Sequence, residues 1–124
     1  EAIKIFTGLM TMLSIGETEG LNGVVLNLIE REDSIELTVT TVTPANKKAF
    51  TLEELQSYVG GLIEEIPMVQ PPENLGAKKL IMFGNEEARL NQKTNWANFF
   101  ASALFVGDYP IVGPVIICHA DMVN

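Results

Sequence analysis

The residue types that build disulfides and zinc centres are scarce in this chain of 124 residues. It has one cysteine, Cys118, and one histidine, His119, directly after it. A lone cysteine forms no internal disulfide, which is compatible with a reducing compartment. Structural zinc sites draw on two separated pairs of Cys and His ligands, and this chain has too few of them. We therefore expect no metal ion and no cofactor.

Basic residues are also few. Eight Lys and Arg stand against sixteen Asp and Glu, which gives a formal net charge of -8. Binding to a phosphate backbone needs clustered cations, whereas Lys47-Lys48 and Lys78-Lys79 are isolated pairs. The acids are scattered, so they give little support to a protein that mimics DNA. We expect no nucleic-acid partner and interpret the negative charge as a source of solubility.

Long apolar runs are absent too. A membrane-spanning helix needs roughly 20 apolar residues, and no stretch here approaches that length. No basic start followed by an apolar run and a cleavage site is visible either, so we expect a cytoplasmic protein without a membrane partner. The numbering opens on Glu1 rather than Met, which leaves room for an initiator or a leader ahead of it.

The composition that remains is globular, with 47% apolar and 19% charged residues. A chain of this size is one domain and buries a substantial core. We interpret residues 1–124 as a single domain, in which residues 1–37 are an N-terminal extension that includes the first strand.

Strand-like alternation is clearest in residues 23–30 and 34–43. The charged segment Arg31-Glu32-Asp33 lies between them, which predicts an antiparallel hairpin with one wet face carrying Glu36 and the threonines.

Three later segments, residues 62–66, 79–83 and 111–119, are also predicted as strands. Pro114 restricts the first half of the last one to an edge or a bulge, because proline donates no hydrogen bond to a sheet. Residues 84–87 are predicted as a turn.

Helix signals are strongest at residues 52–59. Thr51 and Glu54 have the spacing of a capping box, and Phe50 and Leu55 that of the accompanying hydrophobic staple. Glycines 60 and 61 end this helix. Apolar spacing predicts two further helices, over residues 1–15 and 91–103. Together these elements predict an α+β fold, with a mainly antiparallel sheet of about five strands and two or three helices packed on one face.

A resemblance to a known family begins at residues 55–64, which read Leu-Gln-Ser-Tyr-Val-Gly-Gly-Leu-Ile-Glu. The stretch resembles Leu-Gln-x-x-Val-Gly-Gly-x-Ile-Glu in the family called domain of unknown function 3846, found in bacteria, phages and plasmids. That family continues with an Asn-Glu-Glu-Gly-Lys-Leu turn, an Asn-x-x-Ala segment and a closing Gly-x-x-x-Val-Gly strand. The corresponding pieces here follow in the same order at residues 85–90, 95–98 and 107–117.

The resemblance covers residues 38–118, with Ala88 and Arg89 in place of the family's Gly and Lys. It implies a small α+β domain, often carried by mobile elements, in the cytoplasm of a bacterial host. It brings no established catalytic residue and no ligand.

The candidate ligand-binding residues are Gly60, Gly61, Glu64, Asn85, Glu86 and Asn95. Exposed glycine amides are able to cradle an anion, but phosphate loops run from strand through glycines to helix. Here the helix comes first, which favours a helix stop at Gly60 and Gly61.

Acidic residues near the predicted turn suggest a second kind of site. Glu64 and Glu65 are neighbours in a strand and face opposite sides, so they cannot form a catalytic carboxylate pair. One of them, together with Glu86 or Glu87, would suit a hard cation such as Mg²⁺ or Ca²⁺. Solvated glutamates beside a turn are the commoner case.

Two more groups have a plain structural interpretation. Cys118 and His119 also face opposite sides of a strand, so the imidazole cannot activate the thiol. Trp96, Phe99 and Phe100 are interpreted as the core face of a helix rather than a nucleotide-stacking platform, since no basic groove accompanies them.

Three classes of function follow. The sequence favours a non-enzymatic accessory protein of a phage or another mobile element that acts by binding a protein partner. The first alternative is a small-ligand-binding module with its pocket near Gly60, Gly61, Asn85 and Asn95. The second is a metal-assisted enzyme acting through Glu64 and Glu86. A homodimer is a further option.

Overall fold

The computed structural model describes residues 22–70, 79–91, 98, 101–102, 105–107 and 110–123. Its elements, in chain order, are β1 (Gly23–Glu30), β2 (Ile35–Val42), α2 (Leu52–Val59), β3 (Ile63–Ile66), β4 (Leu80–Asn85), η3 (Ala88–Asn91), β5 (Val115–His119) and η4 (Ala120–Met122). The predicted helix over residues 1–15, and most of the one over 91–103, lie outside the described residues.

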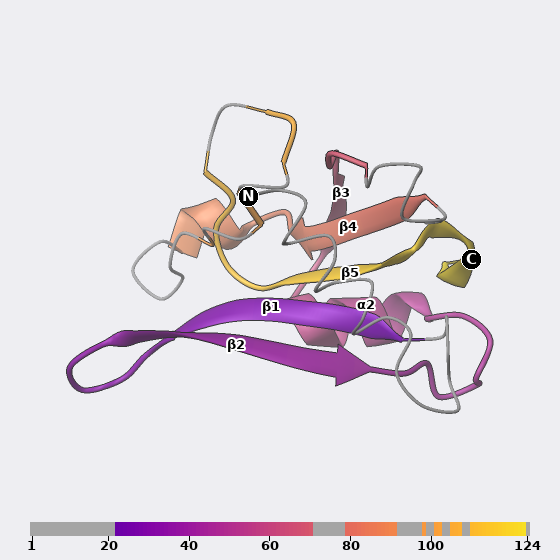
Figure 1. Cartoon of the computed structure of the whole chain (residues 1–124), viewed down its shortest axis with the longest axis horizontal. Coiled ribbons are helices and arrows are strands. Elements are labelled where there is room, and N and C mark those ends of the chain that lie inside the picture. The colour runs from indigo at the N-terminus through magenta and orange to yellow at the C-terminus, as the bar shows by residue number, and fades with distance from the viewer. Residues whose placement is uncertain are drawn as a thin grey trace.

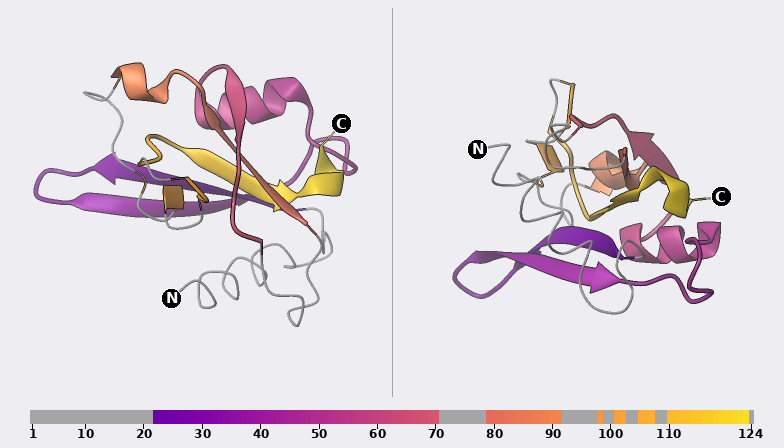
Figure 2. Two further views of the ribbon diagram at one scale, coloured as in Figure 1. Left: turned by 90° about the horizontal axis from the view of Figure 1, so that it is seen from above. Right: turned by 45° about the vertical axis from the view of Figure 1, so that its right-hand side comes forward.

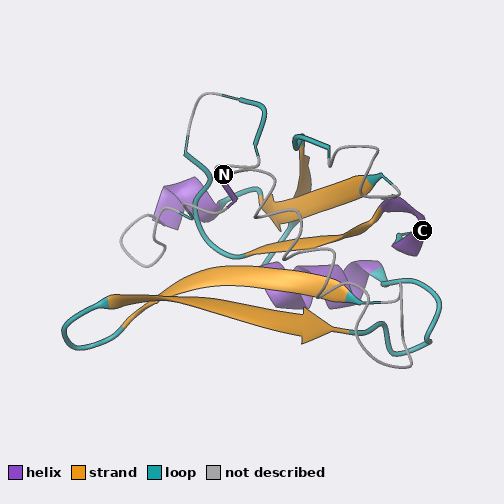
Figure 3. Cartoon of the chain, viewed as in Figure 1, coloured by secondary structure: helices purple, strands orange, loops and turns teal. Residues whose placement is uncertain are grey.

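The strands form one five-stranded antiparallel sheet in the order β2-β1-β5-β4-β3. The helix α2 connects one edge of the sheet to the other and packs on one of its faces (Figures 1, 2 and 3). The predicted α+β class and the antiparallel sheet are therefore confirmed. The described part of the chain contains one α-helix, whereas two or three were predicted.

The local signals at residues 50–61 produce α2 with the predicted limits. The Thr51 hydroxyl accepts from the Glu54 amide at 3.2 Å, and the Glu54 carboxylate accepts from the Thr51 amide at 2.9 Å. Gly60 ends the helix in the left-handed conformation, at φ 84°, where residues with a Cβ are strained. Phe50 and Leu55, the predicted staple, belong to one buried cluster.

Both faces of the sheet bury apolar side chains. The face toward α2 carries Phe83, Ile116 and Cys118, which join Phe50, Leu55, Val59 and Met122 in one cluster. The opposite face carries a second cluster around Val24, Leu26, Met82, Val115 and Ile117. Every residue of β5 is buried for this reason. The strand starts only at Val115 and not at residue 111 as predicted; Pro114, which donates no hydrogen bond to a sheet, lies just before it.

Asn98 is buried in the core, and its hydrogen bonds hold its segment of the chain beside β1 and β5. Its side-chain amide donates to the carbonyls of Leu26 and Gly113, both at 3.0 Å, and its side-chain oxygen accepts from the Ala101 amide at 3.0 Å. Its own backbone amide donates to the Ile111 carbonyl at 2.7 Å. Every polar group that this buried residue brings into the core is thereby satisfied.

The predicted turn at residues 84–87 is wrong in its first half, because β4 runs through Gly84 and Asn85. Gly84 is buried in the sheet, and a Cβ added to it would lie 2.6 Å from Cδ1 of Ile66 on the neighbouring strand. A glycine stands here because the Ile66 side chain packs closely over it and not because the chain turns.

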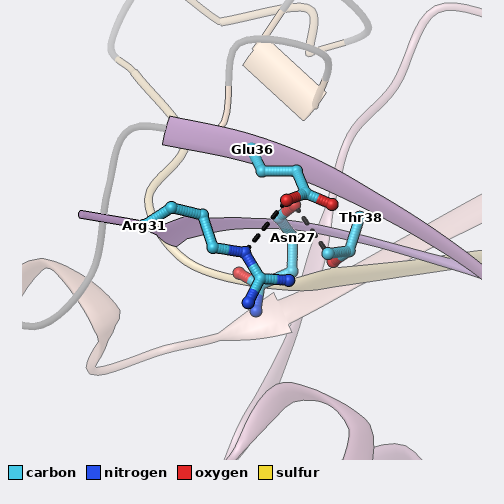
Figure 4. A network of polar contacts seen from close by, with 4 residues as sticks. All are labelled: Asn27, Arg31, Glu36 and Thr38. Carbon is cyan, nitrogen blue, oxygen red and sulfur yellow. Dashed lines mark hydrogen bonds and ion pairs between the residues drawn. The ribbon is translucent and has the colours of Figure 1, made fainter. Parts of the chain in front are cut away.

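The hairpin of β1 and β2 projects beyond the other strands (Figures 1 and 2). Only residues 24–26 of β1 pair with β5. Near its far end Arg31 forms an exposed ion pair with Glu36 at 2.9 Å, and the Thr38 hydroxyl donates to the Asn27 carbonyl at 3.3 Å (Figure 4). Glu36 and Thr40 are exposed as predicted, but Ile35 and Val39, on the opposite face, are exposed as well.

Candidate functional site

A hollow lies between the first turn of α2 and the face of β3 and β4 that α2 leaves open. We call it the apolar groove; it encloses about 590 Å³. Its apolar lining comes from Phe50, Leu52, Leu55, Ile63, Ile81 and Phe83. Thr51 and Glu65 contribute polar groups, and Ala120 and Val123 close the end near the C-terminal segment.

The groove follows from the strand register and from the shortness of α2. Glu65 pairs with Phe83, and Ile63 with Asn85, so Ile63, Glu65 and Phe83 share the face toward α2. An eight-residue helix is only about 12 Å long. It packs mainly on β4 and β5, and the strip of sheet near β3 stays uncovered.

The groove has a buried floor and an exposed rim. Phe50 and Leu55 are almost fully buried, and Phe50 meets Tyr58 edge to face with ring centroids 6.1 Å apart. Leu52, at the rim, is 55% exposed although it is a large apolar side chain. A solid floor with an apolar rim is the arrangement that takes up an apolar side chain from another molecule.

The charges around the groove are negative. Glu65 lines it, Glu53 and Glu54 lie in the first turn of α2, and none of the described residues that line it is basic. Hydrogen bonds from the amides of Thr51 and Ala45 hold the pKa of Glu54 below its ordinary value. This carboxylate is therefore ionised at neutral pH.

The other face of β3 carries a second, smaller hollow of about 180 Å³, which we call the polar hollow. Glu64, Asn85 and Glu86 line it together with Ala88, Ile111 and Val112. Three of the six predicted ligand-binding residues are thus brought together. Asn95 lies outside the described residues.

The two glycines of the predicted site lie next to Asn85. The Asn85 side chain donates to the Val59 carbonyl at 3.3 Å, and a Cβ on Gly61 would lie 2.9 Å from Nδ2 of Asn85. Both glycine amides donate to the Gln56 carbonyl, Gly60 at 2.8 Å and Gly61 at 3.1 Å. These amides close the helix, so they are not directed toward an anion.

Glu64 and Glu86 line the same hollow, but no third carboxylate of the described residues joins them. Within the described ranges no three His, Cys, Asp or Glu side chains are close enough together to hold a metal ion. Glu64 lines the polar hollow and Glu65 lines the apolar groove, which places them on opposite faces, as the strand alternation predicted.

Cys118 and His119 are both buried and lie on opposite faces of β5. Burial, and to a smaller extent the charge of Asp121, raises the pKa of the Cys118 thiol to about 12. The thiol is protonated at neutral pH and is a poor nucleophile. Trp96, Phe99 and Phe100, proposed as a core face, lie outside the described residues.

Sequence reasoning grouped Glu64, Asn85 and Glu86, which line the polar hollow, but it missed the apolar groove. Phe50 and Leu55 were identified only as a helix staple. The available signal was the alternation in two short strands, which puts Ile63, Glu65, Ile81 and Phe83 on one face. That signal does not say how far α2 covers them.

Comparisons with known protein families, with curated proteins and with solved structures gave no match for this chain. The resemblance to the family called domain of unknown function 3846 therefore stays a prediction. No helix among the described residues is long and apolar enough to cross a membrane.

Proposed function

We propose that this protein is a non-enzymatic accessory protein of a phage or another mobile element, and that it binds a segment of another protein in the apolar groove. The groove itself is the observation that supports the binding role. The mobile-element origin rests on the resemblance at residues 38–118.

The bound segment is a peptide with large apolar side chains and at least one Lys or Arg. The apolar lining and the volume of about 590 Å³ suit such a segment, since ligand sites usually measure roughly 300–1,000 Å³. Glu65 lines the groove, Glu53 lies in the adjacent first turn of α2, and the whole chain carries a net charge of -8. Complementary charge speeds encounter with a basic partner and excludes acidic ones.

The experiment is a selection of peptides from a random displayed library on the purified protein, followed by measurement of dissociation constants by fluorescence anisotropy. We expect the enriched peptides to combine spaced apolar residues with Lys or Arg. Leu52→Lys, which puts a cation on the apolar rim, weakens their binding at least tenfold.

The matched control is Leu62→Lys. Leu62 is 53% exposed, nearly the same as Leu52 at 55%, and it does not line the groove. This variant binds the selected peptides as the wild type does. Equal losses in the two variants, or no enriched peptide at all, would contradict the proposal.

The polar hollow supports the small-ligand alternative less well. It joins Glu64, Asn85 and Glu86, but its volume of about 180 Å³ lies below the usual size of a site for an organic ligand. Its acidic lining also disfavours an anionic ligand.

A further inference from the structure

The outer edge of β2 is a free sheet edge among the described residues, since β2 ends the strand order and pairs only with β1. The Arg31 amide donates to the Ser34 carbonyl at 2.7 Å at the hairpin turn. Backbone groups alternate in direction along an antiparallel strand. Those of Leu37, Val39 and Thr41 are therefore directed away from β1, where another strand can pair with them.

The two edges of the sheet differ in how they are protected. The edge strand β3 has four residues, two of them glutamates, and Pro67 follows it. Short length, charge and proline are the usual devices that prevent edge-to-edge pairing. The edge strand β2 has eight residues, IELTVTTV, with no proline. It is rich in β-branched residues, which favour strand pairing.

Charge on β2 is confined to Glu36, and Arg31 of the same hairpin neutralises it at 2.9 Å (Figure 4). From Leu37 to Val42 the strand has no ionisable side chain. Two copies of this segment therefore meet without repulsion, even though the chain as a whole carries a net charge of -8.

Exposed apolar side chains accompany the free edge. Ile35 is 45% exposed and Val39 is 41% exposed, and both lie on the same face of β2. In an isolated domain they face water. A strand added alongside β2 would cover the flanks of both.

We infer that a second copy of this chain pairs with β2, antiparallel and edge to edge, about a two-fold axis at Val39. In this register Val39 lies opposite the partner's Val39, and Leu37 lies opposite the partner's Thr41. Glu36 then faces the uncharged Val42 of its counterpart and not another Glu36. The two five-stranded sheets become one continuous sheet, and the interface is isologous, as closed dimers require.

Sedimentation velocity over a range of protein concentrations tests this inference. The wild type shifts from monomer to dimer as the concentration rises. Val39→Lys brings two ammonium groups together at the axis, and it stays monomeric throughout the range. Val39→Pro removes an outward amide and leaves the hydrogen bonds to β1 in place; it too stays monomeric. Circular dichroism confirms that both variants are folded.

Leu90→Lys is the matched control, because Leu90 is 81% exposed, does not belong to β2 and undergoes the same chemical change. It dimerises as the wild type does. A wild type that is monomeric at every concentration, or Val39 variants that dimerise normally, would overturn the inference. The edge of β2 would then be available to a strand of another protein. Peptide binding in the apolar groove does not depend on β2, so this inference and the proposed function fail independently.

Discussion

Thr51 and Glu54 stabilise the N-terminus of α2, because each side chain accepts a hydrogen bond from the other residue's backbone amide. Thr51→Ala removes one of these acceptors, and we expect it to lower the free energy of unfolding by about 1 kcal/mol. Urea denaturation followed by circular dichroism measures this. The control is Ser57→Ala, an exposed position in the same helix, where we expect a change within roughly 0.5 kcal/mol. Equal effects at the two positions would contradict the capping role.

Glu54 also makes stability depend on pH. Its pKa in the folded protein is lowered from the ordinary value of 4.5 by the amides of Thr51 and Ala45. The ionised Glu54 carboxylate therefore stabilises the folded state fully above pH 4.5. This contribution to stability is lost as the pH falls through the lower, folded-state pKa. We expect the melting temperature of the wild type to fall on acidification below this value, and that of Glu54→Gln to fall less. Parallel curves for the two proteins would show that Glu54 is not responsible.

Asn98 makes long-range contacts that are hard to predict from the local sequence. It was predicted only as part of a helix over residues 91–103, yet it is buried and bonded to carbonyls from two separate parts of the chain. Nothing in its sequence neighbours indicates that Leu26 and Gly113 would come to it.

At the scale of elements, α2 was predicted with its correct limits because its signals are local. The cap, the staple and the terminating glycine all lie within residues 50–61. The end of β4 was missed because the reason for Gly84 is contact with Ile66, which belongs to another strand.

The close approach of the Ile66 side chain to Gly84 allows a double-mutant test. Gly84→Ala places a Cβ 2.6 Å from Cδ1 of Ile66, and we expect it to lower the free energy of unfolding by about 1–3 kcal/mol. Ile66→Val removes that Cδ1 atom, so Gly84→Ala lowers the free energy of unfolding less in the Ile66→Val protein than in the wild type. Chemical denaturation of the four proteins measures the coupling. A cost that is the same in both backgrounds would mean that the contact does not explain the glycine.

At the scale of the whole molecule, the order β2-β1-β5-β4-β3 was beyond sequence reasoning. The hairpin was predictable because its strands are neighbours in the chain. The insertion of β5 between β1 and β4 depends on which apolar faces meet, and several pairings satisfy the same alternation. The apolar groove depends on the same arrangement, because the path of α2 across the sheet decides what stays uncovered.

The two partner surfaces we propose lie at opposite ends of this sheet. The apolar groove lies beside β3, and the edge of β2 is at the other side. A dimer joined through β2 would carry two grooves at its outer ends. Such a dimer would bind with increased avidity to a target that presents two linked copies of the segment.

The central claim, that the apolar groove binds basic, apolar segments, is tested most directly by reversing one of two adjacent charges. Glu65 lines the groove and Glu64 lies on the opposite face, so Glu65→Lys and Glu64→Lys alter the net charge equally. We predict that Glu65→Lys raises the dissociation constant of a selected peptide several-fold, while Glu64→Lys leaves it nearly unchanged. Equal effects, or a larger effect at Glu64, would contradict the account.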